Sequence, residues 1–188
     1  IDMDLAGRAA AGRSSVLRRL RTAFGPGIFD ARGRLDRRAL GRIVLADPEE
    51  RRKLNTIVHP AMLAIVERQM HRCAEGSAPY LIVDSALIFE LGFEKKLDVV
   101  VAVHLPSGLI LERAMARDGL SRAEVLERFA SQLPQEEKCR RADYLLDNSG
   151  TVEELKDRVE VMHAWLLDRA AGISASSWSR DENDGMGG

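Results

Sequence analysis

Cysteine, aromatic residues, net charge and long apolar runs are all scarce in this sequence. Aromatic residues make up 5% of the 188 residues, and the two cysteines, Cys73 and Cys139, show neither C-x-x-C spacing nor a surrounding cluster of metal ligands. The scarcity of cysteine excludes a disulfide-rich scaffold, and the spacing gives no cysteine-based metal site. We expect two free thiols in a reducing, cytoplasmic setting.

The charge balance and the hydropathy narrow the range of partners. The formal net charge is −1, from 28 Lys and Arg against 29 Asp and Glu. A balance so near zero gives no bulk attraction to nucleic acid or to a membrane surface. No apolar run reaches the length that spans a bilayer. We therefore expect neither nucleic acid nor membrane as a partner.

Arginine, in contrast, is abundant and clustered. Basic residues gather at 18–21, 32–42, 51–53 and 113–141. Such clusters are most often solvated helix faces. They also suit phosphate-rich ligands, because a guanidinium group binds two phosphate oxygens at once.

Three segments predict strands of a parallel sheet. Residues 80–84 and 97–103 are continuous apolar, β-branched runs, typical of strands buried on both faces, and residues 143–147 form a shorter candidate. Capping boxes at Ser121 and Thr151 predict the starts of two helices. The alternation of strands and helices indicates an α/β fold with a parallel sheet.

The segment from about residue 5 to residue 78 has helical patterns throughout, with a break at residues 24–34. We interpret it as a helical insertion between two strands. Within it, Asp47 before Pro48 is the signal of a helix start. The tail, 171–188, is rich in Ser, Gly and Asp, and we expect it to be disordered.

The stretch "GRAAAGRS" at residues 7–14 is one substitution away from the phosphate-binding loop G-x-x-x-x-G-K-[ST]. A working loop follows a strand and opens a helix, so that backbone N–H groups converge on phosphate. Here the interior "RAAA" favours helix over a turn, and the central Lys is absent. The alternative is a junction between two helices with glycines at the break.

Acidic residues lie at the expected ends of strands. Asp2 and Asp4 end an apparent strand and share one face if that strand is regular, and Asp84 ends the strand 80–84. Ligands of open α/β sheets bind at these carboxyl ends, where a carboxylate can accept a proton from a substrate hydroxyl. The alternatives are a solvated strand end for the pair, and an N-cap of a helix beginning near Ala86 for Asp84.

Basic residues of the second half form a candidate phosphate clamp. Arg113 and Arg117 lie four apart on the predicted helix 107–118 and emerge on one face. Together with Lys138, Arg140 and Arg141 they can hold a polyphosphate. A solvated helix face is the competing interpretation.

Two further positions carry weaker signals. His59 precedes Pro60, which favours extended backbone and predicts a helix break, and a single histidine is more often structural than catalytic. The "DNSG" stretch at residues 147–150 predicts a loop after a strand, where it can contact a nucleobase.

These residues, taken in order, resemble the dephospho-coenzyme A kinase family closely over about residues 1–166. The family's D-A-D stretch, its F-G then D-R-x-x-L pattern, its D-x-P-L-L-F-E stretch, its lid motif and its A-D-x-x-I-D-N-S-G motif all have counterparts in register. The counterparts are "IDMDLAGR", "FGPGIFDARGRLDRRALGRIVLADPEERRKLNTIVHP", "DSALIFE", "RAMARDGLSRAEVLERFASQ" and "KCRRADYLLDNSG".

The resemblance implies a three-layer P-loop kinase fold that uses ATP and Mg²⁺ to phosphorylate the ribose 3′-hydroxyl of dephospho-CoA, the last step of coenzyme A synthesis. It implies a monomer or a weak homo-oligomer. The expected parts are an α/β core (1–4, 79–112 and 143–170), a helical acceptor-binding domain (5–78), a lid (113–142) and the tail (171–188).

The resemblance also assigns roles to residues. Asp4 aligns with the catalytic base, Arg8 with an arginine that holds the acceptor, Arg113 with the lid arginine that neutralises the transferring phosphate, Leu87 with the acceptor pocket and Asn148 with the loop near adenine. The complete set of candidates is Asp4 and Arg113 as catalytic residues; Asp2, Arg8, His59, Asp84 and Leu87 as acceptor-binding residues; and Arg117, Lys138, Arg141 and Asn148 as nucleotide-binding residues.

The sequence departs from the family pattern in four places. Met3 replaces a small residue, Ala86 replaces a proline, and the segment after Arg8 is one residue shorter and lacks a P-G pair. The family's first strand and glycine-rich loop, with its Lys and its Mg²⁺-binding Ser or Thr, are expected before Ile1. We therefore expect the 188-residue chain alone to be nearly inactive. The alternatives are a short form that binds CoA or nucleotide without catalysis, and a P-loop kinase with another acceptor.

Overall fold

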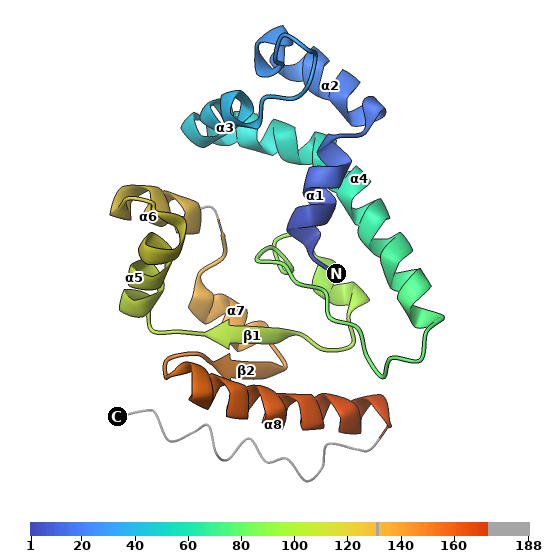
Figure 1. Ribbon diagram of the computed structural model, residues 1–188, viewed down its shortest axis with the longest axis vertical. Helices are drawn as coiled ribbons and strands as arrows, with labels where there is room; N and C mark the ends of the chain where they lie inside the picture. The colour runs from blue at the N-terminus through green and yellow to red at the C-terminus, as the bar shows by residue number, and fades with distance from the viewer. Residues whose placement is uncertain (131, 173–188) are drawn as a thin grey trace. The chain divides into compact units, whose positions relative to one another are not determined.

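The computed structural model describes residues 1–130 and 132–172, which divide into two compact units, residues 1–85 and the described part of 86–188 (Figure 1). The first unit contains α1 (Met3–Ala11), α2 (Ser14–Phe24), η1 (Pro26–Ile28), α3 (Arg37–Ala46) and α4 (Pro48–Ala74). The second contains η2 (Phe93–Lys96), β1 (Val101–His104), α5 (Ser107–Asp118), α6 (Arg122–Ala130), α7 (Gln135–Arg141), β2 (Tyr144–Asp147) and α8 (Val152–Ala170). The tail lies outside the described residues from residue 173 on.

The core of the first unit forms where α2, η1, α3 and α4 meet. Val16, Leu20, Ile28, Leu40 and Ile57 are its buried members. Val16 and Leu20 lie one turn apart on α2, and Leu54, Val58 and Ala61 continue the apolar stripe beside Ile57 on α4. The predicted helical segment and its break between α2 and α3 are confirmed.

Helix α1 packs along α4, as Figure 1 shows. Met3, Ala6 and Ala10, spaced three and four apart, are its buried residues. Gly7 faces Met62 on α4, and a Cβ placed on Gly7 would make an ordinary contact with the Met62 sulfur, at 3.4 Å.

The predicted helix break at His59–Pro60 is wrong, because Pro60 lies inside α4. A proline in a helix lacks the N–H that the carbonyl four residues earlier would accept, here that of Thr56. Arg19 on α2 donates to that carbonyl at 3.4 Å. A side chain from the neighbouring helix thus compensates for part of the lost hydrogen bond.

The predicted strand at residues 80–84 is also wrong. This segment pairs in parallel with Ile1 and Asp2 through a single bridge, Asp2 with Asp84. The hydrogen bonds run from Ile1 N to Ile82 O (2.6 Å), from Asp84 N to Ile1 O (2.8 Å) and from Met3 N to Asp84 O (3.0 Å). Among the described residues the pairing is limited to this bridge, since α1 begins at Met3.

The sheet of the second unit consists, among the described residues, of the parallel pair β1 and β2. Helix α8 packs on β2 (Figure 1), where the Trp165 and Tyr144 rings lie 4.9 Å apart. The two predicted strands are confirmed in shortened form. The burial on both faces predicted for residues 97–103 is wrong, because Val103 is 54% exposed.

Local helix signals of the second unit are confirmed. Ser121 and Thr151 both make the predicted capping boxes with the glutamate three residues later. The chain after Asp84 runs through turns to η2, so Asp84 does not cap a helix near Ala86. Across the described ranges, no helix is both long and apolar enough to cross a membrane.

Candidate functional site

Asp2 and Asp4 do not share a strand face, because the helix begins between them. Asp2 is the N-cap of α1, and its carboxylate accepts from Leu5 N at 2.9 Å. Asp4 lies in the first turn and Arg8 one turn later, so these two exposed side chains emerge on the same side of α1. The structure thus places the candidate base and a candidate acceptor-binding arginine on the same face of one helix.

The "GRAAAGRS" stretch is a junction between helices. Helix α1 ends at Ala11, Gly12 is its C-cap, and Arg13 is the N-cap of α2. Arg37 on α3 donates to the backbone carbonyl of Arg8 at 3.1 Å. The helical conformation of residues 7–11 leaves no backbone nest for a phosphate there, so the look-alike loop is excluded.

The other candidates of the first unit lie apart from Asp4 in the chain. His59 is half-buried in the middle of α4, and burial holds the pKa of its imidazole below the ordinary value of 6.5. Asp84 is exposed, at the parallel pairing with Asp2. In the second unit, Leu87 is half-buried in the turns that lead to η2.

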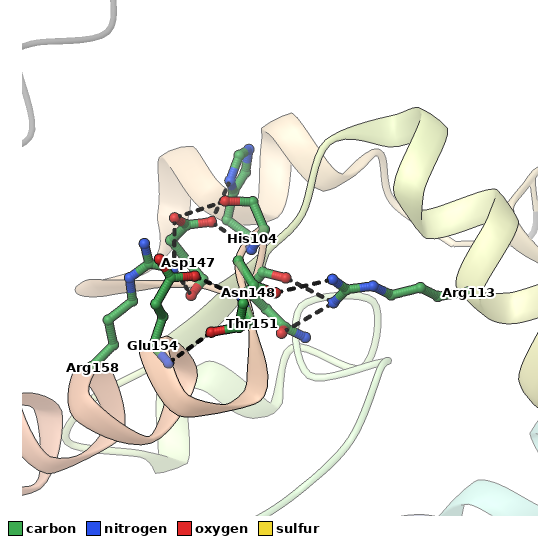
Figure 2. A network of polar contacts seen from close by, with 9 residues as sticks. His104, Arg113, Asp147, Asn148, Thr151, Glu154 and Arg158 are labelled. Atoms are coloured by element: carbon green, nitrogen blue, oxygen red, sulfur yellow. Dashed lines mark hydrogen bonds and ion pairs between the residues drawn. The ribbon is translucent and has the colours of Figure 1, made fainter.

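Arg113 on α5 holds the loop that follows β2, as Figure 2 shows. Its guanidinium donates to the Asn148 carbonyl at 2.8 Å, to Asn148 Oδ1 at 3.2 Å and to the Gly150 carbonyl at 3.2 Å. Two predicted site residues, Arg113 and Asn148, are therefore in direct contact. The guanidinium fork suits this set of acceptors, since its donors have a fixed planar geometry.

The same loop rests on the carboxylate of Asp147. Ser149 donates to it from its backbone N at 2.9 Å and its Oγ at 3.0 Å, and Arg158 on α8 lies 3.0 Å from Oδ2. His104 Nδ1 lies 4.0 Å from Oδ1. Burial alone would raise the pKa of Asp147. The hydrogen bonds from Ser149, followed by the charges of Arg158 and His104, outweigh burial and hold the pKa below its ordinary value.

The remaining basic candidates do not form one clamp with Arg113. Each has its own carboxylate partner: Asp118 for Arg117, Glu90 for Lys138, Glu137 for Arg140 and Glu94 for Arg141. Lys138 also donates to the Ala86 carbonyl at 2.6 Å. To bind phosphate these side chains must exchange a carboxylate for a phosphate oxygen, which is easiest for the exposed Arg117.

A cavity of about 170 Å³ lies between α5 and α6, with Arg117, Asp118 and Arg128 in its lining. Asp118 accepts from both arginines, and the hydrogen bond with Arg117 holds the pKa of Asp118 below its ordinary value. This ion-pair cluster fixes α6 against α5. Cys73 and Cys139 are both free thiols, as predicted.

Sequence reasoning missed His104 and Arg158, and it included Ser149 only as part of the predicted loop 147–150. Their partner Asp147 ends a predicted strand, which was the available signal, because side chains at the carboxyl ends of neighbouring parallel strands meet. Arg158 carried no signal of its own, since its contact depends on how α8 lies beside β2.

Comparison with known proteins decides the family. The family model for dephospho-CoA kinase matches residues 1–154. The chain belongs to the dephospho-CoA kinase family. The curated dephospho-CoA kinase of Geobacter sulfurreducens is 39% identical over 165 residues, covering 87% of this chain and 84% of the relative. That of Thermus thermophilus is 38% identical, covering 92% and 81%.

Solved structures agree with this membership. A crystal structure from Thermus thermophilus superposes with a TM-score of 0.73 at 36% identity, covering 88% of this chain and 83% of that one. The dephospho-CoA kinase from Campylobacter jejuni gives 0.65 at 26% identity, covering 93% and 86%. The predicted α/β class with a P-loop kinase fold is confirmed. The roles of individual residues in a dephospho-CoA kinase reaction stay predictions.

Proposed function

We propose that this protein transfers the γ-phosphoryl group of ATP to the ribose 3′-hydroxyl of dephospho-CoA. The family match over residues 1–154 carries the proposal. The geometry supports it in each unit separately: α1 presents an exposed carboxylate and an exposed arginine one turn apart, and the loop after β2 binds a lid arginine.

Asp4 is the proposed general base. In the reaction the 3′-oxygen attacks the γ-phosphorus, its proton passes to the Asp4 carboxylate, and the bond between the γ-phosphorus and the bridging oxygen breaks to release ADP. An exposed position in the first turn of α1 leaves the carboxylate accessible to an acceptor hydroxyl. Arg8, on the same helix face, is placed to bind the acceptor, with Asp2, His59, Asp84 and Leu87 as further acceptor-binding residues.

Arg113 and Asn148 are the proposed nucleotide-side residues, with Arg117, Lys138 and Arg141 as further contacts. Asn148 offers an amide group to a nucleobase. Arg113 supplies positive charge for the phosphates, since phosphoryl transfer is accelerated mainly by positioning and charge neutralisation. The contact between Arg113 and Asn148 places both groups in one part of the second unit.

Mg²⁺ is proposed to arrive with the nucleotide. No group of three His, Cys, Asp or Glu side chains that could hold a metal gathers in residues 1–130 and 132–172. Those residues therefore supply no complete protein cage. Mg²⁺ sites in kinases rely largely on phosphate and water oxygens, with one or two carboxylates. Bound there, the ion neutralises charge on the phosphates.

A cytoplasmic location and a monomeric or weakly associating state complete the proposal. Free thiols at Cys73 and Cys139 support a reducing compartment. Sedimentation of the purified protein measures the state of association directly.

A coupled ADP-release assay tests the function. We expect the protein expressed from its complete reading frame to release ADP only with dephospho-CoA, at about 1–100 s⁻¹, and mass spectrometry to show one added phosphate on the acceptor. Activity with a nucleoside monophosphate but not dephospho-CoA contradicts the proposed acceptor. Calorimetric binding of dephospho-CoA without ATP binding or turnover indicates a binding module. The 188-residue chain assayed alone tests the separate expectation that it is inactive.

A further inference from the structure

The loop at residues 148–150 is built on a single carboxylate. Asp147, the last residue of β2, accepts from Ser149 N on Oδ1 at 2.9 Å and from Ser149 Oγ on Oδ2 at 3.0 Å. These two hydrogen bonds close the chain into a turn immediately after the strand. The orientation of the Asp147 side chain therefore sets the path of the next two residues.

Arg158 fixes that orientation from α8. One nitrogen, Nη1, lies 3.0 Å from Asp147 Oδ2 and also donates to the Asp147 backbone carbonyl at 3.0 Å. From the neighbouring strand, the backbone carbonyl of His104 accepts the Asn148 N–H at 2.8 Å. Strand end, loop and helix are thus joined around one carboxyl group, as the dashed lines in Figure 2 show.

The far end of the loop is equally constrained. Thr151 and Glu154 form a capping box at the start of α8. A Cβ built on Gly150 lies 2.0 Å from Glu154 Oε2, so the capped carboxylate occupies the space that a side chain would need. The loop between Asp147 and Thr151 is therefore held at both ends.

All three acceptors that Arg113 uses lie between these two anchors. They are the carbonyl and Oδ1 of Asn148 and the carbonyl of Gly150. A planar guanidinium can meet three acceptors only if their spacing is fixed. We propose that Asp147, oriented by Arg158, is a positioning residue for nucleotide binding. It holds the loop in the shape that presents Asn148 and engages Arg113.

This inference rests on the proposed function, since it takes Arg113 and Asn148 as the nucleotide-side residues. It goes further because it assigns the arrangement of Arg113 and Asn148 to a second pair, Asp147 and Arg158, which contacts neither substrate. Loss of the pair loosens the loop and weakens ATP binding, whereas the acceptor-binding residues of α1 and α4 belong to the other unit. The expected signature is therefore a selective change in KM for ATP.

The experiment compares Asp147→Asn, Arg158→Gln and the double variant with Glu160→Gln. The control removes an exposed carboxylate on α8, the helix that carries Arg158. We expect KM for ATP to rise about tenfold in both single variants, because a charge-assisted hydrogen bond is lost, and to rise little further in the double variant. KM for dephospho-CoA, and all parameters of the control, stay within about twofold of the unsubstituted protein. Arg158→Lys, which keeps the charge, recovers part of the affinity.

Equal increases in KM for both substrates, or a lower melting temperature with an unchanged KM for ATP, overturn the positioning role. Additive effects in the double variant also contradict it, since the two residues then act independently. The proposed function fails on a different result, namely the absence of dephospho-CoA-dependent ADP release by the unsubstituted protein. Calorimetry of ATP binding to the unsubstituted protein and to Asp147→Asn tests the positioning role even then.

Discussion

Arg113 and Asn148, 35 residues apart in the chain, meet through two hydrogen bonds, to the Asn148 carbonyl at 2.8 Å and to its side-chain oxygen at 3.2 Å. The second hydrogen bond orients the Asn148 amide group, because the amide oxygen faces Arg113 and the amide nitrogen therefore points away from it. The arginine proposed to bind phosphate and the amide proposed to bind a base are thus in direct contact with each other.

Substitution of Arg113 tests this coupling. We expect Arg113→Lys to lower kcat/KM for ATP about 100-fold, nearly as much as Arg113→Ala, because lysine keeps the charge but lacks the planar fork. Steady-state kinetics with varied ATP measure the effect. Arg72→Lys, at an exposed arginine on α4, is the matched control and should leave kcat/KM within about twofold. Full activity of Arg113→Lys contradicts a role for the fork.

Asp4→Asn separates catalysis from binding. Removal of a general base lowers kcat by about 10²- to 10⁴-fold, and we expect both KM values to change little, because the amide keeps the shape of the carboxylate. Glu75→Gln, at an exposed carboxylate beyond α4, serves as the control. A normal kcat with a raised KM for dephospho-CoA assigns Asp4 to acceptor binding instead.

Gly150→Ala should break the capping box of α8. The added methyl group meets the Glu154 carboxylate, so that side chain must leave its position on the Thr151 N–H. We expect the free energy of unfolding to fall by about 1 kcal/mol, the usual value of a cap. Chemical denaturation measures it.

A double substitution sharpens the test of Gly150. In the Glu154→Ala background the carboxylate is absent and the remaining Cβ of residue 154, at 3.5 Å, makes only an ordinary contact, so the cost of Gly150→Ala should largely disappear. Gly108→Ala, where a Cβ has no neighbour within 4 Å, is the control and should not destabilise. Equal costs of Gly150→Ala in both backgrounds mean that the glycine serves the backbone rather than the cap.

His59 should make stability depend on pH. Burial holds its pKa in the folded state below the ordinary 6.5, so protons bind the unfolded chain more readily. The stabilisation from the neutral imidazole is fully present above about pH 6.5 and is lost as the pH falls through the folded-state pKa. We expect His59→Gln to reduce the fall in the urea midpoint between about pH 7.5 and pH 5. His71→Gln, at an exposed histidine of the same helix, should keep that fall.

Pro60→Ala should stabilise the first unit. Alanine restores an N–H opposite the Thr56 carbonyl and removes the ring from the interior of α4, a gain of about 1–3 kcal/mol. Thermal unfolding measures the change. Pro48→Ala, at the first helical position where no N–H is needed, should have little effect. A lower stability of Pro60→Ala shows that α4 requires the bend that proline imposes.

Local signals predicted much of the fold. The N-cap at Asp47 and the capping boxes at Ser121 and Thr151 act within one helical turn, so four residues contain the relevant information. The strand expected at residues 80–84 failed because strand formation depends on a partner, and the described residues pair with this segment through a single bridge at Asp2.

The candidate site likewise contains residues that local patterns predicted and residues that they did not. The strand-end rule led to Asp147–Asn148, and the helix pattern of residues 107–118 placed Arg113 on α5. The contact of Arg158 with Asp147 could not be predicted, because it depends on the packing of α8 beside β2, which no local pattern encodes. The helix break predicted at Pro60 failed because the local penalty is offset from elsewhere. Arg19, which lies 37 positions from Thr56 in the chain, donates to the Thr56 carbonyl.

The parallel pairing at the start of the chain has a consequence for the order of folding. Ile1 and Ile82 are 81 positions apart, whereas the backbone hydrogen bonds within each helix of the first unit join residues only four apart. Local helices form before a loop of that length closes, because closure costs chain entropy that only the finished contact offsets. We expect the amide protons of Met3 and Asp84 to gain protection from exchange after those of α2 and α4. These two amides thus report when the candidate base on α1 reaches its native position.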